Sequence, residues 1–105
     1  MATNRLDALK QMLAQDPENA FARYGLAMEY SKNDLFEDAI AEFKAVINQD
    51  STYVAAYYHG GQALEKLGRA EDARDFYEQG IEACNRKGDA HTRSEIEAAL
   101  SLLPI

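Results

Sequence analysis

The chain of 105 residues is long enough for one domain with its own hydrophobic core, and its 47% apolar and 28% charged residues argue against intrinsic disorder. Eighteen acidic residues against 11 basic ones give a net charge of −7, which disfavours nucleic acid and anionic membrane surfaces as partners. No membrane span or signal peptide is recognisable, and the single Cys84 permits no internal disulfide. We therefore expect a cytoplasmic protein with a basic or neutral apolar partner.

The first expected element is an amphipathic helix over residues 3–16. Its apolar side chains recur at helical spacing, at Leu6, Leu9, Met12 and Leu13. The dipeptide Asp16-Pro17 closes this helix, and Pro17 suits the first turn of the helix that follows.

Residues 20–53 are repeated in residues 54–87. A shift of 34 residues aligns the two segments with seven identical pairs, where ordinary composition would give roughly two by chance. The pairs are Ala22/Ala56, Tyr24/Tyr58, Lys32/Lys66, Glu37/Glu71, Asp38/Asp72, Ala39/Ala73 and Ile47/Ile81. This self-similarity predicts a tandem repeat.

Each repeat is expected to form two helices separated by a short turn. In the first repeat, apolar residues recur every three to four positions on both sides of Asn33-Asp34. Asp34 is followed three residues later by Glu37, which predicts a capping box at the start of the second helix. In the second repeat Gly68 stands at the turn, where glycine permits the left-handed backbone that ends a helix.

A last helix is expected over residues 89–103, because Gly88-Asp89 combines a helix stop with a helix cap. Its apolar stripe consists of Ile96, Ala99, Leu100 and Leu103. We expect this stripe to cover the second repeat as a C-terminal capping helix. The alternative is that this stripe, or that of residues 3–16, pairs with a second copy in a homodimer.

The repeat resembles the tetratricopeptide repeat (TPR), a 34-residue unit with the pattern W-x2-L-G-x2-Y, then A-x3-F, then P. The first unit offers Arg23, Leu26, Ala27, Tyr30, Ala39, Phe43 and Ser51 at these positions, and the second offers Tyr57, Gly60, Gly61, Leu64, Ala73, Tyr77 and Asn85. Both alanines are present, whereas Arg23 replaces the tryptophan and both closing prolines are missing. The small residues allow close helix packing, with Phe43 and Tyr77 between the units.

The resemblance implies an all-α fold, an α-solenoid of about six antiparallel helices that forms a single domain over residues 1–105. Residues 3–16 would be half a repeat, residues 20–53 and 54–87 two complete repeats, and residues 89–103 the cap.

In function, the resemblance implies a protein-interaction adaptor that binds a peptide of a partner protein in a concave groove. The first helix of each repeat would line that groove, and in residues 20–53 this helix carries a second apolar face beyond its core stripe. The groove candidates are Phe21, Tyr24, Met28, Tyr58, Gln62 and Glu65. An open alternative is that the aromatic members of this set pack into the core. Lys32 and Lys66, near the end of the same face, either steer charged partners or are ordinary solvated residues.

Some chaperone-binding members of the family hold a terminal carboxylate with lysine, asparagine and arginine. The matching positions here are Tyr24, Met28, His59, Asp89 and, with the repeat register continued past Gly88, Arg93. Only Arg93 agrees with that residue set, so we do not expect this mode of binding.

No pattern typical of catalysis is present. The possible reactive residues are Cys84, His59 and His91, and their spacing does not match a zinc site or a nucleophile with its base. The acidic pairs Glu37-Asp38 and Glu71-Asp72 recur at the same place in each repeat, which indicates stabilisation of helix starts. We expect a non-enzymatic protein without metal or cofactor; the alternative function is self-assembly through the terminal helices.

Overall fold

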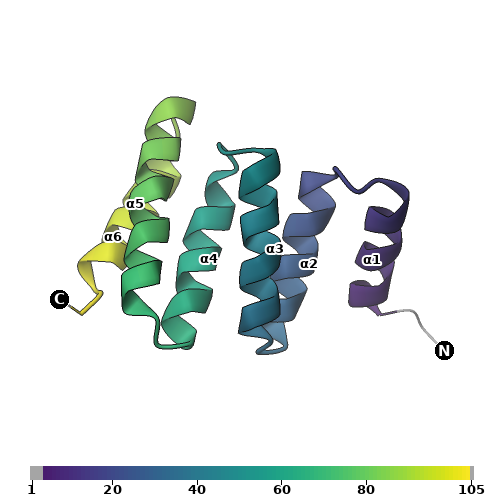
Figure 1. The fold of residues 1–105 in the computed structure, drawn as a ribbon. Helices are drawn as coiled ribbons and strands as arrows, with labels where there is room; N and C mark the ends of the chain where they lie inside the picture. Colours follow the sequence, from purple (N-terminus) through teal and green to yellow (C-terminus); the bar gives the residue numbers. More distant parts are fainter. Residues whose placement is uncertain (1–3, 105) are drawn as a thin grey trace.

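The computed structural model describes residues 4–104, which form six α-helices joined by short turns (Figure 1). The helices are α1 (Arg5–Gln15), α2 (Ala20–Lys32), α3 (Phe36–Gln49), α4 (Val54–Lys66), α5 (Ala70–Lys87) and α6 (Ala90–Ser101). This confirms the predicted all-α solenoid of six helices. Thr3, the expected start of the first helix, and the outermost residues of the expected domain, 1–2 and 105, lie outside the described residues.

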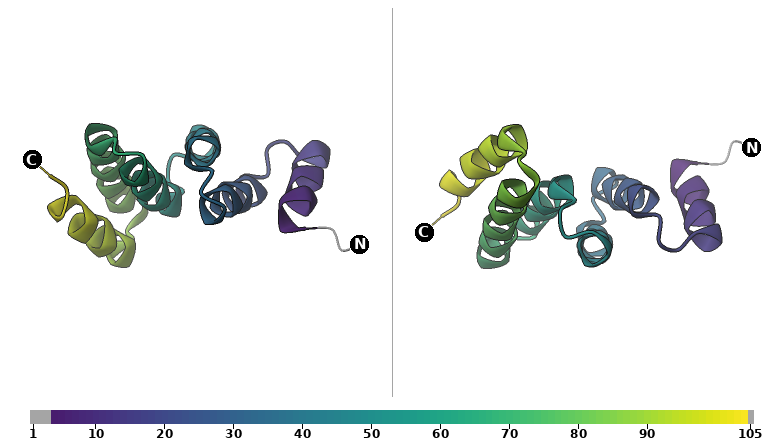
Figure 2. Two further views of the ribbon diagram at one scale, coloured as in Figure 1. Left: turned by 90° about the horizontal axis from the view of Figure 1, so that it is seen from below. Right: turned by 90° about the horizontal axis from the view of Figure 1, so that it is seen from above.

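The helices stand side by side in chain order and run alternately up and down (Figure 1). The molecule is elongated, with extents of 46 × 29 × 19 Å. Each helix contacts the next one along the chain, and α4 additionally contacts both α2 and α6. As a result α2, α4 and α6 share one side of the solenoid, with α3 and α5 on the other (Figure 2). The first helices of successive units therefore form a continuous face.

Small residues bring the helices together around two large aromatic side chains. Phe43 and Tyr77, which occupy equivalent positions in the two repeats, are both fully buried. Ala39 and Ala73 at the equivalent small positions are also fully buried. A Cβ atom at Gly61 would collide with the ring of Tyr77, so α4 and α5 approach closely only because this residue has no side chain. The predicted packing role of these positions is confirmed.

Helix α2 begins three residues later than Pro17, the residue that we expected in its first turn. Asn19 is its N-cap, and the Asn19 side chain accepts a hydrogen bond of 2.9 Å from the backbone N–H of Ala22. The carbonyl of Pro17 instead accepts hydrogen bonds from the side chains of Arg23 and Gln49. The prediction was wrong because Asn19 supplies the oxygen acceptor that the first helical turn requires.

The turn between α2 and α3 also differs from the expected capping box. Asp34 has a φ of 61°, and Leu35 occupies the N-cap of α3 without a side-chain hydrogen bond. The N–H of Leu35 donates a hydrogen bond of 2.8 Å to the carbonyl of Tyr30, which closes the end of α2. Asp34 thus takes the left-handed position that Gly68, with a φ of 74°, takes in the second repeat. The capping-box prediction was wrong because Asp34 terminates α2 and does not start α3.

The junction between α5 and α6 follows the prediction. Gly88 ends α5 with a φ of 77°, and the Asp89 side chain accepts a hydrogen bond of 2.9 Å from the N–H of Thr92. The Thr92 hydroxyl donates a second hydrogen bond, of 2.8 Å, to the same carboxylate. The two hydrogen bonds from Thr92 lower the pKa of Asp89.

The apolar stripes of the two terminal helices pack inside the chain. Leu9 and Leu13 of α1 are buried with Ala22 and Leu26 of α2. Ile96 is fully buried in the cluster that also contains residues of α4 and α5. These stripes are therefore occupied by the protein's own helices.

Candidate functional site

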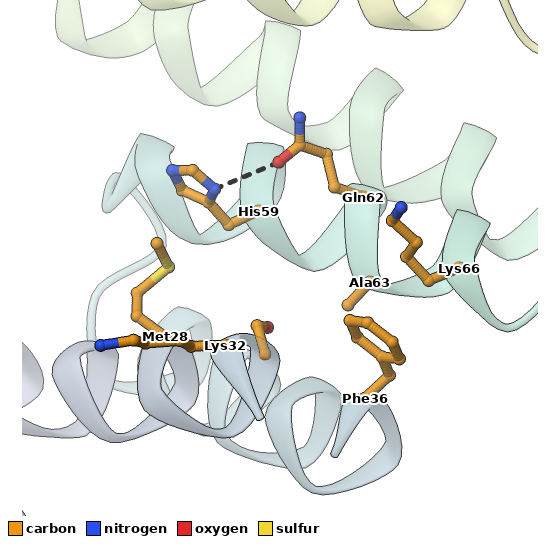
Figure 3. Close-up of a pocket in the computed structure, with 8 residues that line it drawn as sticks. Met28, Lys32, Phe36, His59, Gln62, Ala63 and Lys66 are labelled. Carbon is orange, nitrogen blue, oxygen red and sulfur yellow. Dashed lines mark hydrogen bonds between the residues drawn. The ribbon is translucent and has the colours of Figure 1, made fainter. Parts of the chain in front are cut away.

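A hollow of about 290 Å³ lies between α2 and α4, and we call it the α2–α4 hollow (Figure 3). It is lined by Met28, Ser31, Lys32, Phe36, His59, Gln62, Ala63 and Lys66. Met28 points from α2 towards His59, and the ring of Phe36, the first residue of α3, points towards Ala63 (Figure 3). Because all except Phe36 come from α2 and α4, the first helices of adjacent units create this hollow.

A second hollow of about 390 Å³ lies between α4 and α6, and we call it the α4–α6 hollow. It is lined by Tyr58, Gln62, Glu65, Glu95, Ala98, Ala99 and Leu102. Gln62 lines both hollows, so they are neighbours on the face formed by α2, α4 and α6.

The two hollows are built from equivalent positions. Adding 36 to the numbers of His59, Gln62, Ala63 and Lys66 gives Glu95, Ala98, Ala99 and Leu102. Helix α6 therefore contributes to the face as the first helix of a third unit would. The offset exceeds the 34-residue repeat by two, because α5 (18 residues) is four residues longer than α3 (14 residues) while the linker that follows it is two residues shorter.

Four of the six predicted groove residues line these hollows. Met28 lies in the α2–α4 hollow, Tyr58 and Glu65 lie in the α4–α6 hollow, and Gln62 lies in both. Phe21 is 72% exposed and lines neither hollow.

Tyr24 is half-buried and packs among aromatic rings rather than in a hollow. Its ring centroid lies 5.2 Å from that of Tyr53, 6.1 Å from that of Phe43 and 6.1 Å from that of His59. Burial, with the neighbouring Tyr53, raises the pKa of the Tyr24 hydroxyl. Tyr58 is likewise half-buried against the core, while its side chain still borders the α4–α6 hollow.

The similarity to known proteins agrees with this geometry. A tetratricopeptide repeat family model matches residues 54–87, the residues of the second predicted repeat. A TPR repeat-containing protein of Pseudomonas aeruginosa is 30% identical over 98 residues, which cover 93% of each chain. The chain belongs to the tetratricopeptide repeat family.

Solved TPR structures share the arrangement of helices. A TPR domain protein from Salinibacter ruber is 42% identical, with a TM-score of 0.76 over 82% of this chain and 87% of that one. The TPR2B domain of yeast Sti1, in a complex with pHsp70, has a TM-score of 0.87 over 91% of this chain and 77% of that one. Because the two sequences are only 21% identical, this similarity shows that they share a fold and nothing more.

Several residues that line the hollows on the face formed by α2, α4 and α6 were not predicted from the sequence. Phe36 belongs to α3 and reaches the face only because it follows the turn at Asp34. The α6 residues were missed because the last helix was expected only as a cap over the second repeat, and not as a helix that lines the groove. Arg93 matches a clamp position only if the 34-residue spacing continues past Gly88, where the structure has an offset of 36. Its side chain donates hydrogen bonds to Asn85 and Glu97.

Hydrogen bonds orient two polar side chains that line the hollows, those of His59 and Glu65. His59 Nδ1 lies 3.2 Å from Gln62 Oε1, and desolvation lowers the pKa of His59 although Gln62 and Glu95 favour its protonated form. The hydroxyl of buried Tyr77 donates a hydrogen bond to the carboxylate of Glu65. Burial and the Glu65 carboxylate raise the pKa of this tyrosine.

The possible reactive residues are not assembled into a site. Cys84 is buried, and burial raises the pKa of its thiol, so the nucleophilic thiolate is disfavoured. Within residues 4–104 no hydrogen bond links Cys84, His59 and His91, and no group of three metal-ligating side chains is found. Over the same part of the chain no helix is both long and apolar enough for a membrane crossing.

Proposed function

We propose that this TPR protein is a cytoplasmic adaptor without enzymatic activity, and that the α2/α4/α6 face binds a peptide segment of a partner protein. TPR proteins generally act as protein-interaction modules. The observation that carries the proposal is the pair of equivalent hollows that share Gln62. Repeated clefts along one face suit an extended chain, which presents side chains at regular intervals.

The composition of the hollows supports recognition of apolar side chains. Met28 and Phe36 in the first hollow, and the two alanines with Leu102 in the second, offer apolar surface beside polar groups. Sites for small ligands and peptides commonly combine an apolar lining with a few polar groups that set orientation. Methionine adapts well to different partner shapes.

The complex of the Sti1 TPR2B domain with pHsp70 provides a precedent for the fold. The pHsp70 partner is a property of Sti1 and is not assigned to this protein. Here the positions that match a carboxylate clamp hold Tyr24, Met28, His59 and Asp89 rather than lysine or asparagine. We therefore propose a partner segment of different chemistry.

A groove-blocking variant tests the proposal. Gln62→Trp places a bulky ring between the two hollows at an exposed position, while Glu78→Trp places the same ring at an exposed position of α5 that lines neither hollow. Partners are captured from the native lysate by the wild-type protein and identified by mass spectrometry. We expect Gln62→Trp to lose them and Glu78→Trp to keep them.

Two controls make the result decisive. Circular dichroism must show that both variants retain the helical content and melting temperature of the wild type. Partners retained equally by all three folded proteins would place the binding surface elsewhere and exclude this groove.

A further inference from the structure

We infer that the groove is electrostatically polarised and selects a segment with an acidic side chain over the α2–α4 hollow and a basic side chain over the α4–α6 hollow. This inference rests on the proposed function, because it concerns the chemistry of the peptide that the groove binds. It assigns a direction to the bound segment.

The α2–α4 hollow is a positive region on an acidic protein. Lys32 and Lys66 line it, and none of the residues that line it is acidic. Both lysines are exposed, and neither forms an ion pair among the described residues. Their side chains lie on different sides of the hollow, with Met28 and Phe36 also around it (Figure 3). An apolar side chain with a neighbouring carboxylate matches this surface.

The α4–α6 hollow has the opposite charge. Glu65 and Glu95 line it, and none of the residues that line it is basic. The hydrogen bond from Tyr77 holds the Glu65 carboxylate at the rim of the hollow. Glu95 Oε1 lies 3.7 Å from His91 Nε2, a contact that becomes an ion pair only when His91 is protonated. A lysine or arginine of a partner would find two carboxylates here.

The distance between the hollows sets the spacing of the two charges in the partner. Helix α4 separates the two hollows. A helix with its side chains is about 10–12 Å across, and an extended chain advances about 3.3 Å per residue. An acidic residue over the first hollow therefore places a basic residue over the second about three positions away. Gln62, between the hollows, has an amide that can bond to the intervening peptide backbone.

The two lysines also end their helices, where a positive charge favours the helix dipole. That structural role does not depend on any ligand and predicts no preference for peptide charge. Replacement of these lysines is therefore expected to change the melting temperature whether or not they bind a peptide. Only the preference for peptide charge distinguishes the inferred binding role from the structural one.

Selection from a displayed library of random linear peptides tests the inference on the full chain. We expect enriched sequences in which an acidic and a basic residue stand about three positions apart, in a constant order, with apolar residues between them. The double variant Lys32→Glu/Lys66→Glu should select basic residues in place of the acidic one. The matched control Lys10→Glu/Lys44→Glu changes the net charge equally at exposed positions outside both hollows, and it should keep the wild-type preference.

An enriched peptide, labelled with a fluorophore, then gives dissociation constants by fluorescence anisotropy. We expect about tenfold weaker binding to Lys32→Glu/Lys66→Glu and a change of less than about twofold for the control. Peptides that Gln62→Trp blocks, but that show no charge order and bind both double variants alike, would overturn the inference and leave the proposed function intact. Failure to enrich any sequence would overturn both.

Discussion

The hydroxyl of Tyr77 donates a hydrogen bond to Glu65, and this contact connects the largest fully buried side chain of the described residues to the rim of the α4–α6 hollow. The ring of Tyr77 fills the space between α4 and α5, while Glu65 faces the α4–α6 hollow. One residue of the TPR packing pattern therefore both stabilises the repeat and orients a candidate binding group.

Removal of this hydroxyl should destabilise the protein modestly. We expect Tyr77→Phe to lower the free energy of unfolding by about 1 kcal/mol, because the exposed Glu65 carboxylate regains water while the ring packing is kept. Urea denaturation followed by circular dichroism measures the change. Tyr58→Phe serves as the control, because its hydroxyl has no hydrogen bond to any residue of the described range 4–104. Equal stability of Tyr77→Phe and the wild type would show that the hydrogen bond contributes nothing.

The close approach of α4 and α5 at Gly61 predicts a larger effect. A Cβ atom there would overlap the Tyr77 ring, so Gly61→Ala should destabilise the protein by roughly 1–3 kcal/mol through overpacking. Gly25→Ala is the matched control, because its Cβ would meet only the ends of flexible side chains, Leu9 at 3.1 Å and Arg5 at 3.7 Å. This control should be close to neutral, since alanine favours the helix. Similar melting temperatures for the two variants would contradict the proposed steric cause.

The left-handed position of Asp34 predicts a stabilising substitution. A residue with a Cβ atom costs roughly 1–2 kcal/mol in this conformation. The extra entropy of the unfolded glycine offsets roughly 0.4–1 kcal/mol of this, so Asp34→Gly should stabilise the protein by about 0.5–1 kcal/mol. The reciprocal change Gly68→Asp should destabilise by a similar amount, because Gly68 occupies the equivalent turn. Urea denaturation measures both. Changes of the same sign in the two variants would refute the equivalence.

Asp34 also illustrates what the sequence could and could not predict. The spacing Asp34 to Glu37 is compatible with a capping box, and a local pattern does not distinguish this from a helix stop. The non-local alignment with Gly68 contains that information, since equivalent turns require equivalent backbone angles. The repeat length, the small packing residues and the helix count were predictable for the same reason: each depends on periodicity rather than on one position.

The groove could be predicted only in part. Met28, Tyr58, Gln62 and Glu65 follow from their place on the first helix of each repeat. The contribution of α6 depends on the length of α5 and of the linker after it, which together alter the offset by two residues, and helix ends are poorly defined by local sequence. The exposure of Phe21 and the packing of Tyr24 depend on which neighbours the fold supplies.

The groove histidine predicts a pH dependence of stability. Desolvation lowers the pKa of His59 in the folded protein below its unfolded value, so the unfolded state binds the proton first as the pH falls. The contribution of His59 to stability is therefore intact above the unfolded pKa and declines as the pH drops below about 6.5.

His59→Gln isolates this effect. Its melting temperature should fall less steeply than that of the wild type between about pH 7.5 and about pH 5.5, a window that brackets the unfolded pKa of histidine. His91→Gln is the control on the same protein, because His91 is exposed. Identical slopes for His59→Gln and the wild type would show that burial of this ring has no effect on its titration.

The packing of the terminal stripes predicts a monomer. Leu9 and Leu13 are 6% and 8% exposed, and Ile96 and Leu103 are 0% and 7% exposed. Met12, 45% exposed, is the large apolar residue of α1 that remains on the surface, and single exposed apolar residues are normal in monomers. A stable dimer needs about 1,200 Å² or more of buried surface, which these stripes no longer supply.

Sedimentation velocity over a wide range of protein concentration should give a constant monomer mass. Met12→Glu removes the remaining apolar side chain from the outer part of α1 and should leave that mass unchanged. A dimer that forms with rising concentration and is abolished by Met12→Glu would instead assign self-association to α1. The distinction matters for the groove, because an adaptor that is monomeric presents its two hollows to one partner segment at a time.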